Sequence, residues 1–178
     1  VKSALDMACW DITGQASNMP LWQMMGGECA TPVAVNSSIS TGTPDEMIAL
    51  IRRASQKGYR THSAKIGGSD PATDIARIEA ISNALPAHEN VTFDVNRAWT
   101  PSTAIQVLNS VDARDWVEQP CETLDQCAHV ARRVRNPIML DECMHTFDDH
   151  LNAWKIGACE GVKVKPNRVG GLTRARQI

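Results

Sequence analysis

The sequence predicts an α/β protein of about six parallel β/α units, the repeating unit of a (β/α) barrel of the TIM type. Three observations support this fold class. Short apolar segments alternate with amphipathic helical segments along the chain. The alternation repeats at about the length of one β/α unit, and charged residues end the strands at the same period. With 178 residues, the chain is long enough to bury a core.

The first segment and the first β/α unit show how the elements are assigned. Residues 1–25 have helical periodicity, with an apolar stripe that comprises Ala4, Leu5, Ala8, Cys9 and Ile12. Thr43 is the expected N-cap of the next helix, Pro44 its first residue and Gly58 its terminator. In the following helix, apolar residues lie at helical spacing, namely Ile75, Ile78, Ile81 and Leu85.

The remaining elements follow the same alternation. Strands are expected at residues 32–40, 59–68, 91–95, 115–120, 137–142 and 161–165. Helices are expected at residues 43–58, 70–85, 100–111, 123–134 and 147–157, and a last one begins at residue 170. This order is typical of parallel β/α units.

The composition excludes several classes of function. Hydrophobic residues make up 43% of the chain and charged residues 21%, and the formal net charge is −2. We therefore expect neither a nucleic-acid nor a membrane partner. The N-terminal residues have the pattern of neither a signal peptide nor a transit peptide. None of the six cysteines forms a C-x-x-C pair, so we expect buried, reduced thiols, no zinc site and a cytoplasmic location.

A charged residue ends each strand from the second onward. These residues are Lys65, Asp94, Glu118, Asp141 and Lys165, separated by 29, 24, 23 and 24 residues. In a (β/α) barrel the carboxyl ends of all strands surround one face, so five distant residues should converge there. Any one of them alone is more often a helix cap or an exposed side chain, but the repeated spacing favours a common site.

Three converging carboxylates would repel each other unless a cation lay between them. Oxygen ligands favour Mg²⁺, or Mn²⁺, over Zn²⁺. The two lysines would then flank the metal, an arrangement that suits acid–base chemistry on a substrate whose carboxylate binds that metal.

Several ordered motifs resemble the enolase superfamily, in its muconate-lactonizing and mandelate-racemase branch. They are ALDMACWDITGQASNMPLWQMMGG, FDVNRAW, VEQP, LDE and KPNRVGGLT. The resemblance implies that residues 1–30 are the end of a capping region with its lead-in helix. It also implies that residues 31–178 form strands one to six of a barrel, within a protein about twice as long.

The resemblance also implies the roles of the strand-end residues. Asp94, Glu118 and Asp141 would bind Mg²⁺, and Lys65 and Lys165 would be the bases of strands two and six. Asn96 would support the metal shell around Asp94. The resemblance further implies a homo-oligomer at full length, and we expect the six-strand fragment alone to aggregate because its sheet edges are open.

The strand-two motif departs from the usual Lys-x-Lys of the family, because Ser63 takes the place of the first lysine. Strand six carries an additional lysine, Lys163, two residues before Lys165 and therefore on the same face. We hypothesise that the helper charge has moved from strand two to strand six; alternatively, Lys163 points outward between helices.

The resemblance implies Mg²⁺-dependent removal of the proton α to a substrate carboxylate through an enediolate, followed by epimerisation or dehydration. The segments VKSALDMACWD and VNRAWTP most resemble the branch that acts on hydroxyproline and proline betaine, as a cis-3-hydroxy-L-proline dehydratase or a proline 2-epimerase. Alternatives are another acid-sugar dehydratase or racemase of the superfamily, an aldolase-type barrel in which Lys165 forms a Schiff base, and a non-catalytic metal-binding remnant.

Overall fold

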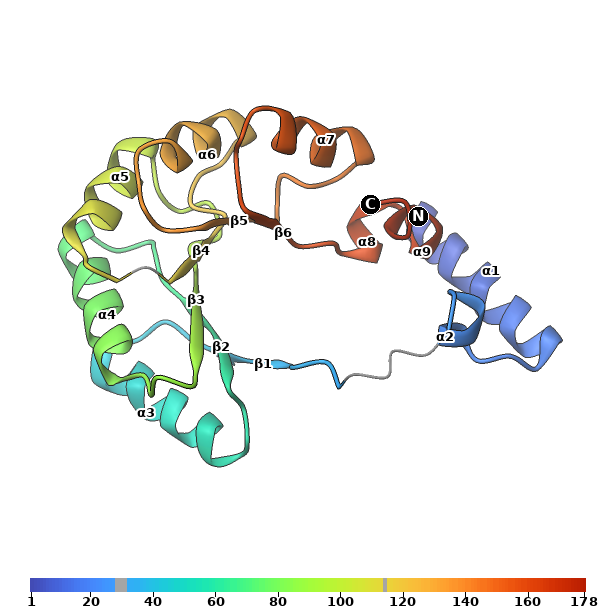
Figure 1. The fold of residues 1–178 in the computed structure, drawn as a ribbon, viewed down its shortest axis with the longest axis horizontal. Helices are drawn as coiled ribbons and strands as arrows, with labels where there is room; N and C mark the ends of the chain where they lie inside the picture. The colour runs from blue at the N-terminus through green and yellow to red at the C-terminus, as the bar shows by residue number, and fades with distance from the viewer. Residues whose placement is uncertain (28–31, 114) are drawn as a thin grey trace.

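A parallel six-stranded sheet forms the centre of the molecule (Figure 1). The computed structural model describes residues 1–27, 32–113 and 115–178. The strands pair in chain order, as β1 (Asn36–Ile39), β2 (Thr61–Lys65), β3 (Asn90–Asp94), β4 (Trp116–Glu118), β5 (Ile138–Leu140) and β6 (Gly161–Val162). Each strand is parallel to the next, so the predicted α/β fold with six β/α units is confirmed.

Helices lie on the outer side of the curved sheet and at the two ends of the chain (Figure 1). The outer helices are α3 (Pro44–Gln56), α4 (Pro71–Ala84), α5 (Pro101–Ser110), α6 (Leu124–Ala131) and α7 (Phe147–Lys155). The terminal helices are α1 (Lys2–Ser17), α2 (Leu21–Met24), α8 (Pro166–Val169) and α9 (Leu172–Ala175). The outer helices connect consecutive parallel strands, as crossover connections require.

Polar caps fix where the outer helices begin. As predicted, Thr43 caps α3: its hydroxyl accepts a hydrogen bond from the Glu46 backbone N–H, and the Glu46 carboxylate accepts one from Thr43 N. Pro44 occupies the first turn, and Gly58, with φ of 96°, follows the end of the helix. Equivalent capping boxes start α6 at Thr123 and α7 at Thr146.

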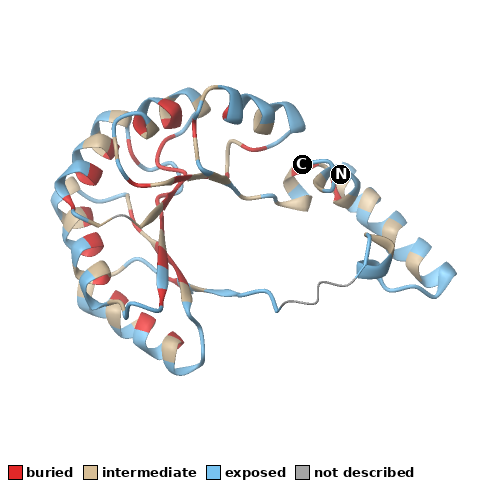
Figure 2. Ribbon diagram, viewed as in Figure 1, coloured by how far each residue is buried: buried red, intermediate tan, exposed pale blue. Residues whose placement is uncertain are grey.

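The hydrophobic core lies between the sheet and the outer helices (Figure 2). Phe93 and Leu140 of the strands are fully buried. Of the predicted α4 stripe, Ile78 and Ile81 are fully buried, and the stripe's two end residues pack partly against the core. The outer face of the sheet thus holds the core, which leaves the carboxyl ends of the strands free for polar side chains.

The contact face of α1 differs from the prediction. The predicted apolar stripe, including Cys9, is exposed, so the expectation that every cysteine is buried is wrong at this position. The opposite face contacts α8 and α9 through polar groups: Ser3 Oγ donates to Asn167 O at 2.6 Å, and Trp10 Nε1 donates to the Thr173 hydroxyl at 2.9 Å. The contact of α1 with the C-terminal segment therefore includes hydrogen bonds made by polar groups of this face.

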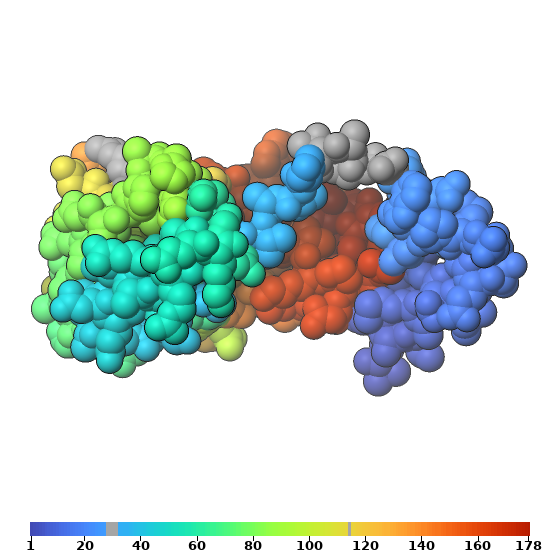
Figure 3. Space-filling view, turned by 90° about the horizontal axis from the view of Figure 1, so that it is seen from below, coloured from blue at the N-terminus to red at the C-terminus, as the bar shows by residue number. Residues whose placement is uncertain are grey.

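A glycine permits the close approach of α1 to α9. A Cβ built on Gly171 would lie 2.3 Å from Asp6 Oδ2, and the φ of Gly171 is 112°, a region that favours glycine. The Asp6 carboxylate accepts a hydrogen bond from Thr173 N at 3.1 Å. Figure 3 shows part of the C-terminal third of the chain between α1–α2 and the β1–α3 segment.

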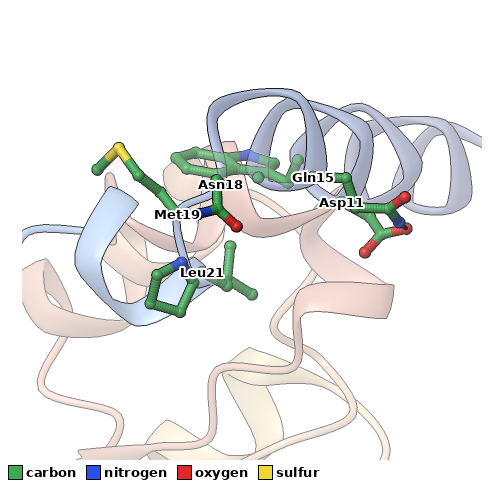
Figure 4. A pocket seen from close by; sticks show the side chains of 8 residues that line it. Asp11, Gln15, Asn18, Met19 and Leu21 are labelled. Atoms are coloured by element: carbon green, nitrogen blue, oxygen red, sulfur yellow. Dashed lines mark hydrogen bonds between the residues drawn. The ribbon is translucent and has the colours of Figure 1, made fainter.

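A surface pocket lies where α1 turns into α2, lined by Trp10, Asp11, Gln15, Met19 and Leu21, among others (Figure 4). None of the five strand-end residues lines it. Within the described ranges, no helix is long and apolar enough to cross a membrane. The predicted domain boundary between residues 30 and 31, and Cys29, lie outside the described residues.

Candidate active site

The carboxyl ends of five strands carry the predicted site residues. Lys65, Asp94 and Glu118 are the last residues of β2, β3 and β4, and they are paired in register across the sheet. Asp141 directly follows β5, and Lys165 follows β6 as the N-cap residue of α8. The parallel topology therefore brings all five residues to the same edge of the sheet.

Each carboxylate of this edge pairs with a different ammonium group. Lys65 Nζ lies 2.5 Å from Asp94 Oδ2, and Lys165 Nζ lies 2.5 Å from Asp141 Oδ2. Glu118 pairs with Lys163, the additional lysine, which directly follows β6. The alternative in which Lys163 points outward between helices is therefore wrong.

Burial divides these groups into two layers. The carboxylate side chains of Asp94, Glu118 and Asp141 are at most 5% exposed, whereas those of Lys65 and Lys165 are 38% and 44% exposed. The lysines therefore lie on the solvent side of a buried carboxylate layer. A small molecule that enters from solvent would meet the lysines first, with the carboxylates directly behind them.

The carboxylates influence one another electrostatically. Burial raises the pKa of Glu118, the charges of Asp94 and Asp141 raise it further, and the hydrogen bond from Lys163 offsets this only in part. Burial also disfavours ionisation of Asp141, but its contacts with Lys165 and Arg168 outweigh burial and lower its pKa. The three acids are thus close enough to interact, and Glu118 is the least compensated of them.

The donor set suits a hard cation. Glu118 Oε1 is buried and accepts no hydrogen bond from any described residue. An orphaned carboxylate oxygen beside two further acids fits Mg²⁺ or Mn²⁺, which bind oxygen ligands. In the described part of the chain, no three His, Cys, Asp or Glu side chains are arranged as a metal cage. Each of the three carboxylates contacts a lysine in this structure.

The loop after β3 is held in an unusual conformation beside the site. Asn96 and Arg97 have φ values of 47° and 69°, a region that costs free energy for residues other than glycine. Asn96 N donates to Asp94 Oδ1 at 3.1 Å, and the Asn96 amide oxygen accepts from Lys65 Nζ at 2.6 Å. Asn96 therefore contacts both members of the Lys65–Asp94 pair.

Two charged residues of this edge were not predicted from the sequence. Arg168 pairs with Asp141 at 2.5 Å and also donates to its backbone carbonyl. Glu142 accepts a hydrogen bond from the Asn96 amide at 2.8 Å. Arg168 lies one helical turn after Lys165 in the KPNRVGGLT motif. This spacing was the sequence signal that could have placed Arg168 beside Lys165 at the site.

Comparison with protein families identifies the chain. Residues 46–178 match the family described as enolase C-terminal domain-like. The chain belongs to the enolase superfamily. Residues 1–26 match the N-terminal domain of mandelate racemase and muconate lactonizing enzyme, so this superfamily member lies in that branch.

Individual relatives agree with this assignment. The chain is 33% identical to a cis-3-hydroxy-L-proline dehydratase of Roseibium aggregatum over 98% of this chain and 48% of the relative. It is 30% identical to an N-succinyl-L-Arg/Lys racemase of Bacillus cereus over 99% of this chain and 49% of the relative. The chain thus spans about half the length of the curated relatives it matches.

A solved structure is more similar. A crystal structure of an enolase superfamily member from Roseovarius nubinhibens, described as complexed with magnesium, is 76% identical to this chain. The match covers 99% of this chain and 48% of that one, with a TM-score of 0.95. The partial (β/α) barrel described above is therefore the arrangement found in an experimental structure of the superfamily.

Proposed function

We propose that the protein in its natural length is an enzyme that removes the proton α to the carboxylate of a small acid. One observation carries this proposal: Lys65 at the end of β2 and Lys165 after β6 lie on the solvent side of a buried carboxylate layer. Two acid–base groups and a cation-binding acid layer are the components that α-proton transfer requires.

The cofactor in this proposal is Mg²⁺, with Mn²⁺ as a possible substitute, and Asp94, Glu118 and Asp141 would hold it. The unpartnered oxygen of Glu118 and the mutual influence of the three acids support this assignment. So does the similarity to a structure that is described as complexed with magnesium. When bound, the cation would stabilise the negative charge that develops on the substrate carboxylate.

The two lysines divide the proton transfers between them. The neutral amine of one lysine accepts the α-proton, and the carbon then carries the electron pair of the broken C–H bond. If the ammonium of the other lysine donates a proton to the opposite face, the product is the epimer. If a β-hydroxyl leaves instead, the electron pair on the α-carbon forms a C=C bond, and the hydroxyl leaves as water with the electron pair of the broken C–O bond and a proton from a lysine ammonium.

The proposed substrate is a hydroxyproline- or proline-type acid, with cis-3-hydroxy-L-proline as the first candidate. The 33% identity to a cis-3-hydroxy-L-proline dehydratase supports this choice. The racemase relative makes another superfamily racemase or dehydratase activity the second candidate. We further propose that the protein forms a homo-oligomer. We also propose a cytoplasmic location, which agrees with the free thiols of Cys121 and Cys127.

Exchange of the α-proton in D₂O tests the proposal. The natural-length protein with Mg²⁺ should incorporate deuterium at the α-carbon of cis-3-hydroxy-L-proline or L-proline, followed by NMR. Lys65→Met and Lys165→Met should each stop net conversion, while the remaining lysine still exchanges the proton from its own side. Lys57→Met, an exposed lysine at the end of α3, is the matched control and should leave the rate unchanged.

Several outcomes would contradict the proposal. Conversion that persists in both single lysine variants would reject the lysine assignment. Full turnover in Asp94→Asn would reject the metal assignment. The absence of exchange with any α-substituted carboxylate would favour a non-catalytic protein, and borohydride trapping of a carbonyl substrate on Lys165 would favour Schiff-base chemistry.

A further inference from the structure

Gln119 occupies a central position behind the carboxylate layer. It directly follows Glu118 at the end of β4, and it is completely buried. Its φ of 39° lies in the left-handed region, which the surrounding structure must stabilise in a residue other than glycine. Strain of this kind is retained where the local conformation has a purpose, so the contacts of Gln119 deserve a functional explanation.

The Gln119 side chain links the ends of β4 and β5. Its amide oxygen accepts a hydrogen bond from Asp141 N at 2.9 Å and a longer one from Cys143 N at 3.4 Å. Its amide nitrogen donates to Cys121 O at 2.9 Å. The side chain thereby connects the residue next to one proposed ligand, Glu118, with the backbone of another, Asp141.

The Gln119 backbone makes one hydrogen bond to β5 and one to the loop that follows β3. Gln119 N donates to Met139 O at 2.8 Å, and Gln119 O accepts from Arg97 N at 2.8 Å. Arg97 lies in the left-handed loop that follows Asp94. One residue therefore joins the three strand ends that carry the three carboxylates.

Only an amide of this length satisfies the whole arrangement. The position requires an acceptor for two backbone N–H groups and a donor for one carbonyl, in a side chain that is completely buried. A methionine side chain has a similar length but provides neither group. An asparagine retains the amide but is one methylene shorter. It therefore cannot reach the Asp141 N–H and the Cys121 carbonyl at the same time.

We propose that Gln119 is a positioning residue that sets the relative placement of the Glu118 and Asp141 carboxylates and thereby the affinity of the site for Mg²⁺. This inference rests on the proposed function, because it assumes that these carboxylates bind the cation. Residues that orient metal ligands typically change metal affinity about 10–100-fold when they are replaced.

The test compares Gln119→Met with Asn136→Leu in the natural-length protein. Asn136 is a matched control because it is also buried and donates two amide hydrogen bonds, to Ala113 O and Asp115 O. It lies before β5, at the opposite end of that strand from Asp141. Mg²⁺ binding is measured by isothermal titration calorimetry without substrate, and folding by circular dichroism during thermal unfolding.

We expect Gln119→Met to weaken Mg²⁺ binding about 10-fold or more, and Asn136→Leu to lower the melting temperature while its Mg²⁺ affinity stays within about twofold of the unmodified protein. If Gln119→Met does not fold, Gln119→Asn provides the same readout with a smaller change. Mg²⁺ affinity unchanged in the folded Gln119 variant would overturn the positioning role alone. Failure of the unmodified protein to bind Mg²⁺ would overturn the metal proposal and this inference with it.

Discussion

Replacing Asp74 by Asn should destabilise the protein strongly, because its carboxylate joins two loops at the site edge of the sheet. Asp74 is completely buried. Its Oδ1 accepts from Gly67 N at 3.1 Å and from Arg77 Nη1 at 3.0 Å, and its Oδ2 accepts from Trp99 Nε1 at 2.9 Å. Gly67 follows the Lys65 strand and Trp99 follows the Asp94 strand, so one carboxylate holds both loops.

The expected loss of unfolding free energy in Asp74→Asn follows from the contacts that an amide cannot make. All three partners are donors, so one of them must face the new NH₂ group without an acceptor. Arg77, whose side chain is 10% exposed, also loses its opposite charge. Removing one partner of a buried ion pair costs about 3–5 kcal/mol. Arg77 keeps the Gly42 carbonyl and the Ser69 hydroxyl as acceptors, so we expect the lower end, about 3 kcal/mol.

Urea denaturation of the natural-length protein, followed by circular dichroism, measures this loss as a shift in the midpoint at constant slope. Asp70→Asn is the matched control: it makes the same chemical change four residues earlier, at the exposed N-cap of α4. Asn caps helices about as well as Asp, so the control should change stability by less than about 0.5 kcal/mol. A difference between the two variants below about 1 kcal/mol would refute the argument.

Three further predictions concern other parts of the chain. Burial opposes the ionisation of Glu89, but hydrogen bonds from Ser55 and His62 outweigh it and hold its pKa below 4.5. Glu89 therefore contributes stability above about pH 4.5 that is lost as the pH falls through its folded value, and Glu89→Gln should flatten the acid side of a plot of urea midpoint against pH. Lys163→Met should lower kcat about 10–100-fold with Mg²⁺ saturating, because Lys163 pairs with the site carboxylate of Glu118, whereas Lys163→Arg should largely retain it; a Lys163→Met rate equal to that of the unmodified protein would return Lys163 to a purely structural role. Residues 1–178 expressed alone should aggregate, since β1 and β6 are open sheet edges, and a monodisperse, cooperatively melting product in size-exclusion chromatography and calorimetry would contradict this.

The sequence predicted the features that depend on periodicity. Parallel β/α units have a nearly constant length, so the regular spacing from Lys65 to Lys165 was sufficient to place five residues at one edge of the sheet. Thr43 and Gly58 similarly predicted where α3 begins and ends, because local conformation alone determines a helix cap.

Features that depend on tertiary contacts were not predictable in this way. The contact face of α1 is decided by partners more than 160 residues away, such as the Thr173 hydroxyl that accepts from Trp10. The ion pair of Arg168 with Asp141 joins helix α8 to the end of β5, and the relative placement of these two segments is not encoded in any periodicity of the sequence. Gln119 stood in a recognised motif, but its left-handed backbone, and hence the direction of its side chain, is known only from the folded chain.

The contact between α1 and the C-terminal helices has a consequence for synthesis. Ser3 binds the carbonyl of a residue 164 positions later, so α1 leaves the ribosome long before its partner exists. At about 5–20 residues per second, the delay is roughly 8–33 seconds. During this time a 16-residue helix with no buried residue of its own is only marginally stable in water. The N-terminal segment must therefore remain available, and is open to chaperones, until α8 and α9 have emerged.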